Sequence, residues 1–346
     1  MLRDSRPGTP GAPCFVRGTR ILTPAGEMPV EELVPGAIVI TVSGVRRRVT
    51  WVGHRRLDLA RHPRPHVASP VRISRGAIGN GIPSRDLLVS PDHALMLNET
   101  LIPARALING ATVIADLGWA RVEYVHVALD APDVLLAEAA PAESFPAAGA
   151  TEAFEGAAVL MLHPGFADPP ADAADPRPRA SAGPAVREAR RALLTRARHL
   201  GHALTRAPDL HLLADGTRLN PTGLAGSIYR FAIPPGTADL RIVSRAGVPA
   251  ETDPDSEDRR RLGVKLGALA LRIGDRWREL PAADATLTEG FHPPEGRGGT
   301  LWRWTDGHAR LPAVPGNLTA LDLHVIGAQA AWARAAPPDA PMHRSA

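Results

Sequence analysis

Short segments in which apolar and polar residues alternate run through the first part of the chain, and turn-forming residues separate them. In one such segment, Ile38, Ile40 and Val42 alternate up to the turn sequence Ser43-Gly44, and apolar residues return after it. Alternation with a period of two on both sides of a glycine-containing turn predicts a β-hairpin. Because such patterns recur from residue 14 to about residue 145, we expect a domain built from short strands.

Strand patterns resume at about residue 208. Leu269, Leu271 and Ile273 alternate before the turn sequence Gly274-Asp275, and Leu321 begins another alternating segment near the end of the chain. Strands with turn signals at this spacing predict a β-sandwich. We therefore expect a second, separate β domain.

A helical pattern lies between these two regions. Residues 166–184 are rich in Ala, Asp, Pro and Arg, which is typical of a linker. The apolar residues that follow recur at helical spacing: Val186, Ala189, Leu193, Ala197, Leu200 and Leu204. Arginines surround them, so the pattern predicts a basic amphipathic helix. Contact with an anionic surface is one interpretation, and packing against one of the two domains is the favoured one.

An internal repeat indicates how the first domain is built. Residues 28–40 align with residues 102–114 at an offset of 74, and six of the 13 aligned positions are identical. Each copy reads as a short helical turn, a glycine and a strand. Two copies are too few for a solenoid, so they favour a duplicated β domain with an internal pseudo-two-fold axis.

Composition agrees with a mostly β fold class. The 346 residues are enough for two domains with separate cores, and 35 prolines with 32 glycines favour short elements and many turns. The predicted organisation is a short leader (1–13), a first β domain (14–165), a linker with the basic helix (166–207), a C-terminal β-sandwich (208–335) and a disordered tail (336–346).

Charge and histidine content exclude several classes of partner. The formal net charge is only +4, and no basic stripe with interleaved aromatic residues is visible, so we expect no nucleic-acid partner. His199 and His202 lie three residues apart with no third ligand in view. We therefore expect no metal site, and nothing in the sequence points to a cofactor.

The sequence leaves the compartment open. A single cysteine excludes an internal disulfide framework, so the fold needs no oxidising environment. The N-terminus lacks the apolar core of a signal peptide, and no segment reaches the roughly 20 apolar residues of a membrane span. A cytoplasmic location is the default expectation, with export lacking a signal as the alternative, and no membrane span is expected.

The single cysteine, Cys14, directly follows Pro13 and lies N-terminal to nearly the whole chain. A thiol in this position can attack the carbonyl of its own preceding peptide bond, because the covalent chain guarantees proximity. This N-to-S acyl shift also needs oxyanion stabilisation and a proton donor for the leaving nitrogen. In the sequence Ser90-Pro91-Asp92-His93, Ser90 is a candidate for orienting the bond and His93 for donating the proton.

These segments resemble the Hint family of self-processing domains, which includes hedgehog C-terminal domains and inteins, and most of all its bacterial intein-like branch. The similar segments occur in the family's order: Cys14-Phe15, Gly18-Thr19, Thr23, Val30–Leu33, Gly36, Trp51–Gly53, Asp86–His93, Pro103–Arg105, Asn109–Ala111, Tyr124–His126, Leu135–Glu138 and Ala142–Phe145. The resemblance implies a processing thiol at Cys14, a catalytic histidine at His93 and a fold of two related halves, which agrees with the repeat.

Three departures from the family pattern narrow the expected activity. Ala37 replaces a usual acidic residue, and Pro132 stands where a histidine is often found. In addition, none of the five asparagines precedes Cys, Ser or Thr, although splicing ends with cyclisation of such an asparagine. We therefore expect thioester formation and cleavage at the Pro13–Cys14 bond without splicing.

Two classes of function stay open. In the first, the chain is a single-turnover autoprocessing enzyme whose substrate is its own N-terminal peptide and whose acyl acceptor is unknown. In the second, an inactive Hint scaffold binds a protein or glycan through its C-terminal domain, where Trp302 and Trp304 could form a sugar-stacking platform, although core packing is favoured. His126 is either part of the Cys14 site or an ordinary strand histidine. A cysteine peptidase acting in trans is a weaker third option.

Overall fold

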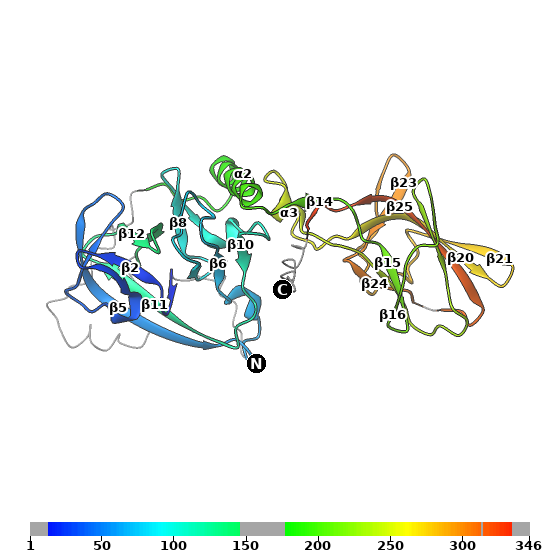
Figure 1. The fold of residues 1–346 in the computed structure, drawn as a ribbon, viewed down its shortest axis with the longest axis horizontal. Coiled ribbons are helices and arrows are strands. Elements are labelled where there is room, and N and C mark those ends of the chain that lie inside the picture. The colour runs from blue at the N-terminus through cyan, green and yellow to red at the C-terminus, as the bar shows by residue number, and fades with distance from the viewer. Residues whose placement is uncertain (1–12, 146–176, 313, 334–346) are drawn as a thin grey trace, which may run out of the picture. The chain divides into compact units, whose positions relative to one another are not determined.

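In the computed structural model, residues 13–145, 177–312 and 314–333 are described. The chain divides into two compact units, Met1–Gly201 and His202–Ala346. Both consist mainly of β-strands, which confirms the mostly β fold class (Figure 1). The predicted leader, except for Pro13, and the predicted tail lie outside the described residues.

The described part of the first unit contains two antiparallel sheets. The seven-stranded sheet has the order β10 (Val113–Ala115), β6 (Val71–Ile73), β7 (Leu87–Val89), β1 (Phe15–Val16), β11 (Arg121–Leu129), β5 (Arg46–Asp58) and β4 (Ile38–Ile40). The six-stranded sheet has the order β3 (Gly26–Pro29), β2 (Arg20–Thr23), β12 (Val134–Ala137), β13 (Ala140–Glu143), β8 (Ala94–Leu97) and β9 (Thr100–Pro103). Side chains of both sheets contribute to one core, among them Phe15, Val125 and Leu135.

The internal repeat corresponds to a repeat in structure. The first copy forms β3, the 3-10 helix η1 (Val30–Glu32) and β4, and the second forms β9, η3 (Ala104–Ala106) and β10. β4 and β10 are the two outermost strands of one sheet, and β3 and β9 are those of the other. Gly36 and Gly110, identical in the alignment, both have left-handed φ values, of 95° and 70°. Glycine is the residue that adopts this conformation at least cost, so the shared glycines preserve the same turn.

The predicted hairpin forms between β4 and β5. β4 pairs with β5 so that Ile38 lies opposite Arg48 and Ile40 opposite Arg46. Val39 is fully buried, whereas Ile38 and Ile40 are half-buried and Val42 is exposed. The face that carries Ile38, Ile40 and Val42 is therefore not the core face, because neighbouring strand residues point to opposite faces and Val39 points to the core.

Helix α2 (Pro184–His199) belongs to the first unit. Three of its apolar residues are part of that unit's core: Val186, Ala189 and Leu193. The helix is shorter than predicted, since Leu200 is exposed and Leu204 lies in the strand β14 (Leu204–Thr205). Gly201 has a φ of 92°, a left-handed conformation typical of helix ends.

The residues before α2 add an extended segment to the edge of the six-stranded sheet. The Leu101 N–H donates to the Pro178 carbonyl at 2.9 Å, and the Ala180 N–H donates back to Leu101 at 3.0 Å. Arg177 pairs with the buried Asp133 at 2.8 Å, and Arg179 pairs with the buried Glu143. This segment and α2 thus form part of the first unit, although the sequence indicated a linker up to residue 184.

The second unit contains two larger sheets around one core. The four-stranded sheet has the order β16 (Thr217–Leu219), β15 (His211–Ala214), β19 (Leu240–Val243) and β24 (His308–Arg310). The other has the order β17 (Gly223–Ala225), β18 (Ile228–Ala232), β25 (Leu318–Ala328), β20 (Val264–Ile273), β23 (Thr300–Trp304) and β22 (Glu295–Arg297), with β21 (Arg276–Pro281) paired to β20. The remaining elements are the short helix α3 (Pro249–Thr252) and β14 paired with β26 (Ala331–Trp332). Leu212 and Leu240 of the first sheet share one core with Leu323 of the second, which is the arrangement expected of a β-sandwich.

Trp302 and Trp304 do not occupy that core. Both are half-buried, and Lys265 lies over them, with its Nζ 3.7 Å from the centre of the Trp302 ring and 5.8 Å from that of Trp304. The expectation of core packing was therefore wrong. The only lysine of the chain contacts the aromatic faces by cation–π attraction.

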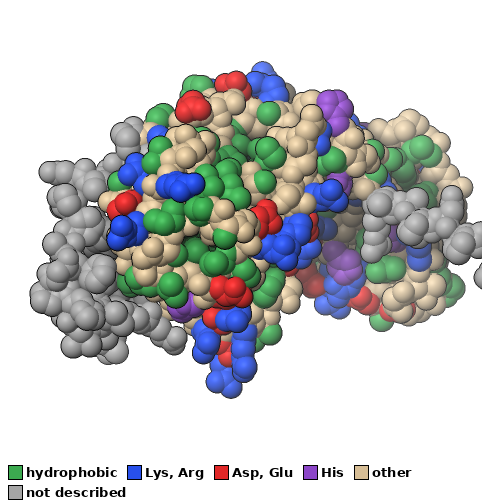
Figure 2. Space-filling view, turned by 60° about the vertical axis from the view of Figure 1, so that its left-hand side comes forward, with side chains coloured by type: hydrophobic (Ala, Val, Ile, Leu, Met, Phe, Trp, Pro, Cys, Tyr) green, Lys and Arg blue, Asp and Glu red, His purple; other side chains and the backbone are tan. Residues whose placement is uncertain are grey.

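Charges of both signs are interspersed over the face shown in Figure 2. Many arginines pair with carboxylates, for example Arg85 with Glu138 at 2.6 Å and Arg230 with Asp322 at 2.7 Å. In the described ranges, no helix combines the length and the apolar character that crossing a membrane requires.

Candidate active site

Cys14 is buried directly before β1. β1 lies between β7 and β11, and Phe15 pairs with both Val89 and Val125. Two hydrogen bonds then connect Cys14 to Ser90, the residue after β7: the Cys14 N–H donates to Ser90 Oγ at 3.1 Å, and the Ser90 N–H donates to the Cys14 carbonyl at 2.9 Å. Ser90 thus contacts the peptide nitrogen of the Pro13–Cys14 bond, and its orienting role stays a prediction.

His126, on β11, contacts both sides of the same peptide bond. Its Nε2 lies 3.1 Å from Cys14 Sγ, and its Nδ1 lies 2.8 Å from the carbonyl oxygen of Pro13. A carbonyl oxygen only accepts hydrogen bonds, so Nδ1 carries the proton. Nε2 of the neutral ring is therefore the acceptor that faces the thiol.

Burial sets the protonation states of this pair. Loss of solvation raises the pKa of the Cys14 thiol to about 12, against smaller opposing effects of the Ser90 hydrogen bond and the Arg55 charge. Loss of solvation also lowers the pKa of His126 to about 4. At neutral pH the thiol is therefore protonated and the imidazole is an uncharged base.

Aromatic rings enclose His126. The Phe145 ring lies 5.3 Å from the rings of both His126 and Trp51, and Trp51 lies 6.3 Å from His126. Trp51 reaches this position by folding over Gly53, which is paired with His126 across the strands. A Cβ on Gly53 would lie only 2.1 Å from Trp51 Cη2, so only glycine leaves room for the ring.

His93 lies close to the site but in a different environment. It is fully buried, and its ring contacts Phe15 edge-on at 4.4 Å. Within the described part of the chain neither ring nitrogen has a hydrogen-bond partner. Burial lowers the pKa of His93 to about 3, although the nearby backbone of Cys14 and Glu143 favours the charged form. His93 is therefore neutral at physiological pH, and its role as proton donor stays a prediction.

A buried carboxylate supports the segment that carries His93. Glu143 accepts a hydrogen bond from the Ala94 N–H at 2.6 Å and pairs with Arg179. The sequence did not predict that Glu143 supports this segment, because its partner Arg179 lies 36 positions later in the chain. The residues around the thiol were nevertheless present in the family-like motifs, which include Trp51, Gly53 and Phe145.

The structure brings Cys14, Ser90 and His126 into direct contact and places His93 next to them. The sequence left two interpretations of His126 open. The structure places its ring beside Cys14, and its role in a site stays a prediction. Among the described residues, no three His, Cys, Asp or Glu side chains gather in a way that could hold a metal ion.

Comparison with known proteins gives a family for the first unit only. Residues 13–149 match the family model described as Hint domain. No curated protein is significantly similar to the chain.

Among solved structures, a bacterial intein-like domain from Clostridium thermocellum is similar, with 14% identity, a TM-score of 0.29 and coverage of 38% of this chain and 97% of that one. The gp41-1 intein has 11% identity and a TM-score of 0.27, with coverage of 38% and 98%. The MchDnaB-1 intein has 13% identity and a TM-score of 0.26, with coverage of 37% and 98%. The family match and the order of the motifs along its strands show that the first unit contains a Hint domain.

Proposed function

We propose that the Hint domain cleaves the chain at the Pro13–Cys14 bond by an N-to-S acyl shift, without splicing. The observation that carries this proposal is the position of His126, whose two ring nitrogens contact the thiol and the carbonyl oxygen of that bond. One neutral imidazole is thus placed to accept the thiol proton and to donate a hydrogen bond to the oxygen that becomes negative.

In the proposed step, Cys14 Sγ attacks the carbonyl carbon of Pro13 as its proton passes to His126 Nε2. Negative charge develops on the Pro13 oxygen, which already accepts a hydrogen bond from His126 Nδ1. The carbon–nitrogen bond then breaks, and the nitrogen, which contacts Ser90, takes the N–H proton of the neutral His93 ring as the other ring nitrogen of His93 receives the proton that His126 took from the thiol. His126 gives up its extra proton and His93 regains one, so the net change is transfer of one proton from sulfur to nitrogen.

The product of this step is a thioester between Pro13 and the Cys14 side chain, with a free amine at Cys14. Water, an added thiol or another nucleophile would then release the acyl group. Splicing is not part of the proposal, because no asparagine of the chain precedes Cys, Ser or Thr.

The high pKa of Cys14 favours an attack in which proton removal and bond formation are coupled. A thiol with a pKa of about 12 contains very little thiolate at neutral pH, so a base in contact with it is needed. His126 satisfies this requirement by geometry, and its pKa of about 4 leaves the ring unprotonated throughout the neutral range. The same low pKa makes it a weak base, so the proton has to leave the thiol as the carbon–sulfur bond forms.

Intact-mass measurement of the purified chain tests the proposal. Incubation with hydroxylamine or dithiothreitol should release residues 1–13 and leave a product that begins at Cys14. Cys14→Ala should release nothing, and His126→Gln should slow release by about 10²–10⁴-fold, the usual contribution of a positioned base. His66→Gln, at an exposed histidine outside the site, is the matched control and should behave as wild type.

An inactive Hint scaffold is the competing proposal. A wild-type mass that stays unchanged under both nucleophiles, identical in behaviour to Cys14→Ala, would support it and contradict autoprocessing. Equal rates of release by wild type and His126→Gln would support cleavage at this bond but contradict the assignment of His126 as the base.

A further inference from the structure

In the second unit, one charged side chain of the edge strand β21 is on the face of the strand that points toward the core. On β21, Leu280 is buried and Trp277 is exposed, so even-numbered positions point toward the core. Arg278 is one of these positions, and it pairs directly with Leu271 of β20. The inner face of the sheet is otherwise apolar here, since Leu271 and its neighbour in register Leu321 are buried.

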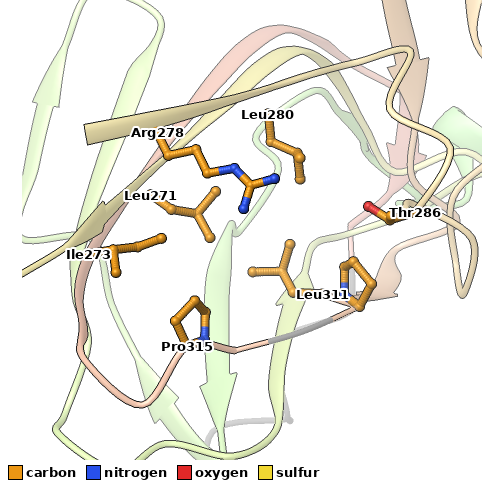
Figure 3. Close-up of a pocket in the computed structure, with 8 residues that line it drawn as sticks. Leu271, Ile273, Arg278, Leu280, Thr286, Leu311 and Pro315 are labelled. Atoms are coloured by element: carbon orange, nitrogen blue, oxygen red, sulfur yellow. The ribbon is translucent and has the colours of Figure 1, made fainter. Parts of the chain in front are cut away.

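Arg278 lies beside a cavity of about 170 Å³. The other residues that line it are almost all apolar: Leu271, Ile273, Leu280, Thr286, Leu311, Pro312 and Pro315. Figure 3 shows the guanidinium extending between Leu271, Leu280 and Leu311. Arg278, Thr286 and Pro312 are exposed, so the cavity opens to solvent on their side.

The N–H groups of the Arg278 guanidinium are available to donate hydrogen bonds to a ligand. Among the described residues it makes no hydrogen bond or ion pair. Asp284 is the acidic side chain that senses its charge, and that carboxylate already accepts hydrogen bonds from the backbone and hydroxyl of Thr286, at 2.9 and 2.5 Å. A planar fork of N–H donors matches a carboxylate, with which arginine forms two parallel hydrogen bonds.

The volume limits the apolar part of a ligand. A buried cavity of about 150 Å³ lined by Leu, Ile and Phe binds benzene, so this slightly larger one accommodates about six carbon atoms. Small-molecule sites commonly combine an apolar lining with a few placed polar groups that fix orientation. We propose that the pocket binds a small carboxylic acid whose apolar body fills the cavity and whose carboxylate pairs with Arg278.

A structural explanation for Arg278 competes with this proposal. β21 pairs only with β20 in the described structure, so it is an edge strand. Charged residues that point inward on edge strands hinder pairing with another chain. In that case replacing Arg278 would increase self-association without affecting any ligand.

Binding of phenylacetate to the full chain tests the proposal, measured by calorimetry together with chemical shifts of residues around the cavity. We expect phenylacetate to bind and its uncharged analogue 2-phenylethanol to bind at least about tenfold more weakly, since a hydroxyl group cannot form the charged, two-hydrogen-bond pair with the guanidinium. Arg278→Gln should weaken phenylacetate binding by a similar factor, and Arg278→Lys by less. Arg276→Gln, on the same strand and outside the cavity lining, is the control and should bind as wild type.

Four results would overturn the assignment. They are the absence of phenylacetate binding at millimolar concentration, equal affinity for phenylacetate and 2-phenylethanol, equal affinity of wild type and Arg278→Gln, and much tighter binding of a peptide ending in phenylalanine. The last would assign the pocket to a peptide C-terminus instead of a small acid. Because the pocket involves no residue of the Hint domain, Cys14→Ala should bind phenylacetate normally, whatever its effect on processing.

Discussion

At the scale of single residues, burial determines the chemistry of the thiol site. The Cys14 thiol, His126 and His93 are all buried, and in each case burial disfavours the charged form. Full transfer of the thiol proton to His126 would create a buried ion pair, so loss of this proton has to be coupled to attack on the carbonyl carbon. The same burial carries a thermodynamic consequence, because the unfolded chain exposes both histidines to water.

Stability of the first unit should therefore fall as the pH is lowered from about 6.5. The pKa of His93 is lowered from 6.5 to about 3, so in this window the unfolded state binds a proton that the folded state does not. Each such group reduces the free energy of unfolding by about 1.4 kcal/mol per pH unit. His126, with a pKa of about 4, adds the same sign of effect over a narrower window.

Urea unfolding of wild type and His93→Gln at pH 7, 6 and 5 measures this effect. The free energy of unfolding of the variant should fall less steeply with pH, by about 1.4 kcal/mol per pH unit, whatever its value at pH 7. An identical pH slope for the two proteins would show that His93 titrates normally in the folded state.

At the scale of elements, the site depends on how neighbouring strands approach each other. β5 and β11 pair over most of their length, which places Gly53 directly opposite His126. The missing side chain of Gly53 is the space into which the Trp51 ring folds. The pairing of β5 with β11 therefore also determines where the Trp51 ring packs beside His126.

Gly53→Ala should displace Trp51 and slow release of residues 1–13. The added Cβ would lie within 2.1–3.0 Å of three atoms of the Trp51 ring, and overpacking of this kind typically costs about 1–3 kcal/mol. Gly79→Ala is the matched control, because its Cβ would meet only Ile82 Cβ at 4.0 Å. Tryptophan fluorescence and the mass assay check both variants, and wild-type behaviour of Gly53→Ala in both would contradict the assigned packing.

At the scale of the whole molecule, the main cores of the two units are separate. The core of the first unit includes Leu193 of helix α2, and that of the second includes Leu269 of β20. No residue belongs to both cores among those the structure describes. Processing and ligand binding should therefore respond independently to core substitutions.

Leu193→Ala and Leu269→Ala test this independence as a crossed pair. Each removes a nearly fully buried leucine and should cost about 2–5 kcal/mol in its own unit. Leu193→Ala should lower the unfolding midpoint of the first unit and spare phenylacetate binding, while Leu269→Ala should do the reverse and spare release of residues 1–13. Hydrogen exchange resolved by segment provides the readout, and loss of protection in both units by either variant would contradict two independent cores.

The sequence by itself determined the local features of this protein. Period-two alternation specified strands and the β20–β21 hairpin, the repeat specified two related halves, and the position of Cys14 after Pro13 brought the thiol to its candidate bond by covalent connection. Each of these depends on neighbours along the chain. The ends of α2 and the buried face of β4 were less well determined, because they depend on which side of an element meets the core.

Only the tertiary structure decided which side chains meet at the thiol. Contact between Cys14 and His126, 112 positions apart, follows from the register of β1 against β11. The same holds for Arg278, whose inward direction follows from its pairing with Leu271. Periodicity along a strand predicts that residues alternate between two faces, but packing of the sheets decides what each face contacts, because burial and hydrogen bonding are satisfied by partners distant in sequence.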